Sequence, residues 1–132
     1  MTGPVFHLSI PVSDLARSLS FYETLGGERG RLHDDWADIW LFGGQITLFL
    51  DAGLAAVAPS LGRTHFGGTL GKGDWDALVA RVAGQGLAAV RGPVSEPAPG
   101  GFQHKLYLRD PDGWTVEIKS YDDAAAALER AL

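Results

Sequence analysis

The 132-residue sequence contains no cysteine, only three lysines and no apolar run close to the length of a membrane span. Without cysteine, a disulfide framework, a thiolate zinc site and a cysteine nucleophile are excluded, so any chemistry rests on histidine, carboxylate and hydroxyl groups. The net charge of −5 argues against nucleic acid or an anionic membrane as the partner. The first residues also lack the basic region of a signal peptide. We therefore expect a soluble, cytoplasmic protein that acts on a small molecule.

The composition is that of one globular domain. Hydrophobic residues make up 45% of the chain and charged residues 20%, values that argue against disorder. The 18 glycines and seven prolines indicate many turns and argue against a helical bundle. We expect a single domain over residues 1–132.

The first part of the chain has the pattern of a strand, a helix and two further strands. Apolar and polar residues alternate over residues 5–12, which predicts a half-buried strand. Ser13 is placed to cap a helix that ends at residues 26–27, two glycines. Alternation returns at residues 36–42 and 45–50, which predicts two further strands.

The same order follows a second time, after a predicted linker at residues 51–62. It begins with a strand at residues 64–70 and a helix capped by Asp74. Beyond a glycine- and proline-rich stretch at residues 92–101, two strands flank the turn sequence Asp-Pro-Asp-Gly. The predicted bounds are 105–109 and 114–120 for those strands, 110–113 for the turn and 122–132 for a terminal helix.

This repeated order predicts an α+β fold built from two βαβββ modules. His7 and His65 open the first strand of each module. We place module one at about residues 5–50 and module two at about residues 63–121.

Three side chains on these strands could bind a metal. His7, His65 and Glu117 are predicted to leave the sheet on the face opposite the helices. Two imidazoles and one carboxylate suit Fe(II), Mn(II), Zn(II), Co(II) or Ni(II), and such a set leaves positions open for a substrate. The alternative is that each histidine is structural and that the glutamate is a solvated surface residue. His104 falls on the core side of its strand and is expected to be structural.

Two stretches resemble the vicinal oxygen chelate superfamily: HLSIPVSDLARSLSFYETLGG at residues 7–27 and DPDGWTVEIKSY at residues 110–121. That superfamily includes glyoxalase I, type I extradiol dioxygenases, fosfomycin-resistance transferases and bleomycin-resistance proteins. The resemblance covers about residues 5–121. It implies a cupped mixed sheet with helices on its outer face, a bound divalent metal and a homodimer. The modules could pair within one chain or across the dimer.

The ligand positions that the resemblance implies fall on His7, Thr47, His65 and Glu117. Threonine is a poor ligand where glyoxalase I is expected to use glutamate, so a glyoxalase I reaction is disfavoured. The remaining three-ligand arrangement is the one expected of extradiol dioxygenases and fosfomycin transferases. Tyr107 falls where both groups carry a tyrosine, which implies a catalytic role.

The resemblance also indicates residues that would contact the substrate. Ser9 falls where fosfomycin transferases have a threonine, and Lys105 could meet an anionic group. Trp40 and Phe49 would line the cup and favour an aromatic ligand. However, Leu50 stands where the dioxygenases draw an acid–base histidine.

Two functions follow from these expectations. The first is a metal-dependent enzyme that chelates two neighbouring substrate oxygens, most like the three-ligand extradiol dioxygenases. The second is a protein of the bleomycin-resistance type, which would sequester a drug or metabolite without catalysis. The acidic balance of the chain would suit a cationic ligand in that second function. The three retained ligand positions favour the enzyme.

Overall fold

The computed structural model describes residues 3–55 and 63–130 of the chain, which divides into two compact units. Unit 1 comprises Met1–Leu61 with Asp110–Trp114, and unit 2 comprises Gly62–Arg109 with Thr115–Leu132. Residues 56–62 of the predicted linker and residues 131–132 of the predicted terminal helix lie outside the described part. The expected division at residues 51–62 stays a prediction.

Unit 1 contains one four-stranded mixed sheet and one helix. Its elements are β1 (His7–Val12), α1 (Leu15–Thr24), β2 (Glu28–Leu32), β3 (Trp36–Leu41) and β4 (Gly44–Leu50). The strand order is β1-β4-β3-β2, with β1 parallel to β4 and the other pairs antiparallel. Helix α1 packs on β2, β3 and β4. Alternation places Ile39 and Leu48 in the core between sheet and helix, where both are fully buried.

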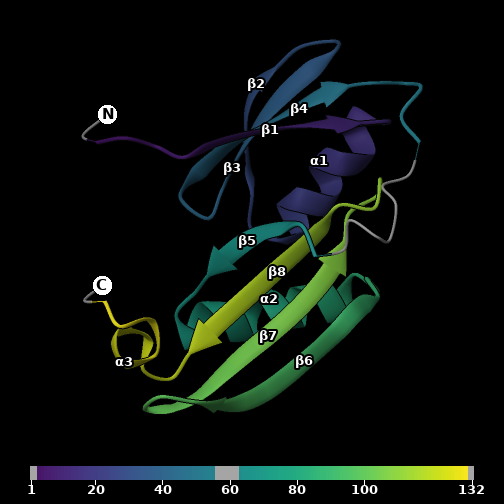
Figure 1. Cartoon of the computed structure of the whole chain (residues 1–132). Helices are drawn as coiled ribbons and strands as arrows, with labels where there is room; N and C mark the ends of the chain where they lie inside the picture. Colours follow the sequence, from purple (N-terminus) through teal and green to yellow (C-terminus); the bar gives the residue numbers. More distant parts are fainter. Residues whose placement is uncertain (1–2, 56–62, 131–132) are drawn as a thin grey trace. The chain divides into compact units, whose positions relative to one another are not determined.

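Unit 2 repeats this arrangement and adds a short helix. Its elements are β5 (His65–Thr69), α2 (Lys72–Gly84), β6 (Ala89–Ala98), β7 (Gly101–Arg109), β8 (Thr115–Tyr121) and α3 (Ala124–Leu128). The order β5-β8-β7-β6, with β5 parallel to β8, matches that of unit 1 (Figure 1). The prediction of an α+β fold with two βαβββ modules is thereby confirmed, and His7 and His65 each begin the first strand of a module.

Two edge strands were not predicted. Strand β2 has the sequence ERGRL, and all five of its residues are exposed, so it shows no apolar alternation. Strand β6 covers most of the glycine- and proline-rich stretch at residues 92–101, for which no strand was predicted. Its two prolines are tolerated because β6 lies at the edge of its sheet, where a strand needs hydrogen bonds on one side only.

Both predicted helix caps are wrong. The N-cap of α1 is Asp14, whose carboxylate accepts a hydrogen bond from the Arg17 N–H at 3.0 Å. Ser13 instead donates its hydroxyl hydrogen bond to Asp112 at 2.5 Å. In α2 the N-cap is Gly71, and Asp74 lies in the first turn. There its negative charge stabilises the helix by interacting with the positive N-terminal end of the helix dipole.

The Asp-Pro-Asp-Gly turn between β7 and β8 belongs to unit 1. Its first aspartate, Asp110, is buried and accepts a hydrogen bond from the Tyr22 hydroxyl at 2.7 Å. The indole N–H of Trp114 donates to the Pro11 carbonyl at 3.2 Å. These contacts connect the turn to α1 and β1. Within the described residues, no helix has the length and apolar character needed to cross a membrane.

Candidate functional site

The structure brings together two of the three predicted metal ligands. His65 Nε2 lies 2.7 Å from Glu117 Oε2, across the parallel pair β5 and β8. Glu117 is buried, whereas 38% of the His65 side chain is exposed. No group of three histidine, aspartate or glutamate side chains that could hold a metal occurs among residues 3–55 and 63–130. His7 belongs to unit 1, so the three-ligand set stays a prediction.

The second ring nitrogen of His65 is held by the backbone. Nδ1 lies 2.8 Å from the carbonyl oxygen of Arg63, which can only accept a hydrogen bond, so Nδ1 carries a proton. This leaves Nε2 directed at the Glu117 carboxylate, 2.7 Å away, an arrangement in which the two side chains can share a proton or bind one metal ion together. A histidine that donates Nδ1–H to a carbonyl has the orientation usual for metal ligands. The donor set therefore fits a divalent ion.

Gly67 permits the close approach of the two strands. It pairs with Glu117 in the β5–β8 register, and a Cβ at this position would overlap the Glu117 carbonyl group. Only glycine leaves room for the backbone of β8 here. The glycine therefore keeps β5, and His65 on it, within reach of the carboxylate.

Tyr107 lies beside the same carboxylate. It pairs with Glu117 across β7 and β8, and its ring centroid lies 6.0 Å from that of His65. Burial, the charge of Glu117 and a hydrogen bond with Glu117 raise the pKa of Tyr107. The hydroxyl is therefore protonated at neutral pH and acts as a hydrogen-bond donor. The catalytic role expected of Tyr107 stays a prediction.

The corresponding positions in unit 1 have a different chemistry. Thr47 occupies the register position of Glu117, and Asp38 that of Tyr107. The Thr47 hydroxyl donates to Asp38 Oδ1 at 2.7 Å, and Arg31 Nε donates to Asp38 Oδ2 at 2.6 Å. Burial alone would raise the pKa of Asp38, but hydrogen bonds from Arg31, Thr47 and Gln45 outweigh it and hold that pKa below its ordinary value. Asp38 is thus a buried, ionised and fully engaged carboxylate.

The other predicted substrate contacts fall on both units. Ser9 is exposed on β1 and pairs with Thr47, while Trp40 and Phe49 are exposed on β3 and β4 at 43% and 41%. Lys105 Nζ lies 3.2 Å from Glu96 Oε2 in unit 2. That ion pair engages the lysine, and its expected contact with a substrate stays a prediction.

A pocket of about 360 Å³ opens next to His65 in unit 2. Its lining consists of Arg63, His65, Val90, Arg91, Tyr107, Arg109 and Thr115. Of these residues, His65 and Tyr107 were identified from the sequence. Arg63 and Arg91 had no assigned face, because Arg63 adjoins the linker and Arg91 lies on the strand that was not predicted.

Comparison with known proteins agrees with the observed fold. The family model of the Glyoxalase/Bleomycin resistance protein/Dioxygenase superfamily matches residues 5–118. The chain belongs to this superfamily. A glyoxalase/bleomycin resistance protein/dioxygenase from Alicyclobacillus acidocaldarius shares the fold with a TM-score of 0.76 at 26% identity, covering 96% of this chain and 98% of that one.

Two curated relatives have names that describe different functions. Virulence protein STM3117 of Salmonella typhimurium is 28% identical over 123 residues, which cover 87% of this chain and 82% of the relative. Glutathione transferase FosA of Serratia marcescens is 29% identical over 121 residues, which cover 85% of this chain and 77% of the relative. The superfamily accounts for the repeated module, and it leaves the chemistry to be argued from the site.

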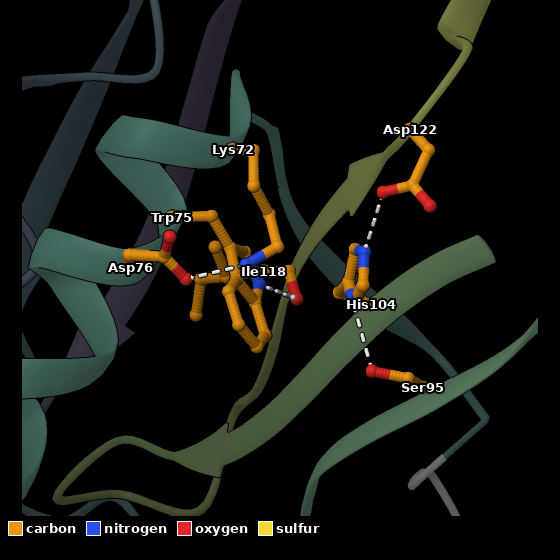
Figure 2. Close-up of polar contacts among 7 residues, drawn as sticks. All are labelled: Lys72, Trp75, Asp76, Ser95, His104, Ile118 and Asp122. Carbon is orange, nitrogen blue, oxygen red and sulfur yellow. Dashed lines mark hydrogen bonds and ion pairs between the residues drawn. The ribbon is translucent and has the colours of Figure 1, made fainter. Parts of the chain in front are cut away.

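His104 has the structural role expected of it. Figure 2 shows its ring between Ser95 and Asp122, with Nδ1 2.7 Å from the Ser95 hydroxyl and Nε2 2.8 Å from Asp122 Oδ1. Trp75 of α2 lies against it, with ring centroids 5.5 Å apart. The residue connects β6, β7 and the end of β8 on the helix side of the sheet, away from Glu117.

This cluster predicts a dependence of stability on pH. Hydrogen bonds from His104 and from the Phe102 N–H lower the pKa of Asp122. Because the folded pKa is below the unfolded one, the stabilisation is present above about pH 4 and is lost as the pH falls through the folded pKa. We expect Asp122→Asn to lower the melting temperature at pH 7 and the difference from wild type to shrink in acid.

Thermal unfolding followed by circular dichroism between pH 7 and pH 3 measures this difference. Asp34→Asn, at an exposed position between β2 and β3, is the matched control and should follow wild type. A constant difference at every pH would show that the charge of Asp122 does not contribute.

Proposed function

We propose that this chain is a metal-dependent enzyme that acts on a small molecule, with a divalent ion bound by His7, His65 and Glu117. The observation that carries the proposal is the His65–Glu117 pair, whose histidine is oriented through Nδ1 by the Arg63 carbonyl. A divalent ion at this position supplies Lewis acidity to two neighbouring oxygens of a substrate.

The residues around the pair have separate tasks in this proposal. Tyr107 keeps its proton at neutral pH and would donate its hydrogen bond to a substrate oxygen in place of the Glu117 carboxylate, its present hydrogen-bond acceptor. Gly67 holds the strands that carry the two ligands of unit 2 close together. Ser9, Thr47, Trp40 and Phe49 are proposed substrate contacts on unit 1.

The reaction type follows from the metal and the substrate. Ring opening of the extradiol dioxygenase type is the reaction expected from the sequence, and the likeness to a glutathione transferase adds group transfer as a candidate. The expected homodimer and the aromatic ligand also belong to this proposal.

A second candidate function is sequestration of a drug or metabolite without catalysis. It is favoured by Thr47, since the position equivalent to Glu117 in unit 1 carries a hydroxyl that is already donated to Asp38. A protein of this kind would bind its ligand with the same affinity with and without metal.

Metal content separates the two functions. Protein is purified anaerobically without a histidine tag, and its metal content is measured by elemental mass spectrometry before and after reconstitution with each ion. We expect about one Fe, Mn, Zn, Co or Ni ion per chain in at least one of these samples. Oxygen uptake with catechols and thiol consumption with electrophilic substrates then distinguish the two reaction types. Absence of bound metal after every reconstitution would overturn the enzyme proposal and favour sequestration.

A further inference from the structure

Unit 2 concentrates positive charge around one pocket of an acidic protein. The chain has a net charge of −5 and 11 lysine and arginine residues, yet Arg63, Arg91 and Arg109 all line the pocket of about 360 Å³ beside His65. None of the described residues that line this pocket is acidic. The local charge is therefore opposite to that of the whole chain, and it disfavours the cationic ligand that the overall composition suggested.

Two carboxylates adjoin the pocket: Glu117, which faces His65, and Glu96, which forms an ion pair with Arg91. Arg91 Nη2 lies 2.7 Å from Glu96 Oε1, and the second oxygen of Glu96 meets Lys105 Nζ at 3.2 Å. One negative charge is thus shared between two cations. Because the Arg91 side chain is 55% exposed, the ion pair costs little to rearrange when a ligand arrives.

The walls of the pocket also have an apolar part. Val90 and the ring of Tyr107 line it, and the Arg91 guanidinium carbon lies 5.9 Å from the Tyr107 ring centroid. The volume suits a small organic molecule. Arginine binds carboxylate and phosphate oxygens through two parallel N–H donors, which gives these groups an advantage over a neutral head group.

We propose that this pocket binds the oxyanion group of a small organic acid, a carboxylate, phosphonate or phosphate, with its apolar portion against Val90 and Tyr107. His65 lines the same pocket, so a molecule held there by its anionic end has its remaining atoms next to the His65–Glu117 pair. The assignment as a substrate site rests on the proposed function, whereas the binding of the anion does not require a metal.

Isothermal titration in the presence of EDTA tests the anion site separately from the metal. Benzoate and phenylphosphonate are the anionic probes, and benzamide is the neutral one. We expect both anions, or one of them, to bind at least roughly 10-fold more tightly than benzamide and to weaken as sodium chloride is raised. The stronger anion identifies whether a carboxylate or a phosphonate is preferred.

Variants locate the site. The double substitution Arg91→Gln with Arg109→Gln should weaken the anions roughly 10–100-fold, since hydrogen bonds to charged groups are being removed. Arg130→Gln, an exposed arginine beyond α3, is the matched control and should bind as wild type. Melting temperatures establish that each variant is folded.

Two outcomes overturn the proposal. One is equal affinity of wild type for benzamide and the anions, which requires no variant to fold. The other is unchanged anion affinity in the folded double variant. Metal titration of the same double variant should match wild type, so failure of the anion site and failure of the metal site give different results.

Discussion

Replacing Glu117 with glutamine should weaken divalent-metal binding by at least roughly 100-fold, since even the supporting partners of metal ligands contribute about 10–100-fold. The substitution keeps the size of the side chain but removes the negative charge that faces His65 Nε2 at 2.7 Å. A neutral amide oxygen is a much poorer partner for a divalent cation than a carboxylate. Titration calorimetry with Co(II) or Ni(II) measures the affinity.

The control for this variant is Glu28→Gln, which removes one negative charge from an exposed position on β2. It should bind metal as wild type does, which excludes a general effect of net charge. Unchanged affinity in folded Glu117→Gln would place any bound metal elsewhere and remove the basis of the proposed enzyme.

The two histidine variants extend the same measurement. His65→Ala should match the loss seen in Glu117→Gln, because the two side chains face each other within unit 2. A comparable loss in His7→Ala is required by the three-ligand proposal. Retained affinity in His7→Ala alone would restrict the site to residues of unit 2.

The part of the fold that was predicted is the part with clear periodicity. Strand β4 alternates between buried and more exposed residues along most of its length, and β3 alternates apolar with polar or aromatic residues in its sequence. The bounds of both strands were predicted to within one residue. Strands β2 and β6 lie at sheet edges, where one side of the strand has no neighbouring strand. Such strands need no strong apolar alternation, and β6 even accommodates two prolines, so the patterns used for central strands miss them.

The helix caps failed for a different reason. Ser13 and Asp14 are both good capping residues, and the local sequence does not decide between them. The decision comes from Asp112, 99 positions away, which accepts hydrogen bonds from the Ser13 hydroxyl and N–H. A contact of this length becomes visible only once the Asp110–Trp114 turn is known to belong to unit 1.

The site shows the same division between local pattern and long-range contact. Strand faces were enough to place Glu117 away from the helices, and the structure pairs it with His65. The positions of Arg63 and Arg91 could not be predicted from strand faces. Arg63 precedes β5 and Arg91 lies on the unpredicted β6, so neither had an assigned face. Recognition of the edge strand would have been necessary to find the cationic pocket.

Replacing Asp110 with alanine should produce the largest loss of stability, roughly 3–5 kcal/mol, given about 1–3 kcal/mol for each buried donor left without a partner. The Asp110 carboxylate accepts the Tyr22 hydroxyl at 2.7 Å and the N–H groups of Asp112 and Trp114 at 3.0 and 2.9 Å. The substitution would leave all three donors without this hydrogen-bond acceptor. The total free energy of unfolding of a domain of this size is about 5–15 kcal/mol. Urea unfolding should therefore show a large shift of the midpoint to lower urea concentration.

Asp110→Asn separates the hydrogen bonds from the charge. The amide keeps an oxygen for the two backbone donors, and its NH₂ group can donate to the Tyr22 hydroxyl, so a much smaller loss is expected. Burial raises the pKa of Asp110 despite these hydrogen bonds. Its contribution is therefore most favourable below the unfolded pKa, near pH 4, and is lost as the pH rises through the folded pKa. Asp110→Asn should remove that pH dependence, and equal losses in both variants would show that the hydrogen bonds do not stabilise the turn.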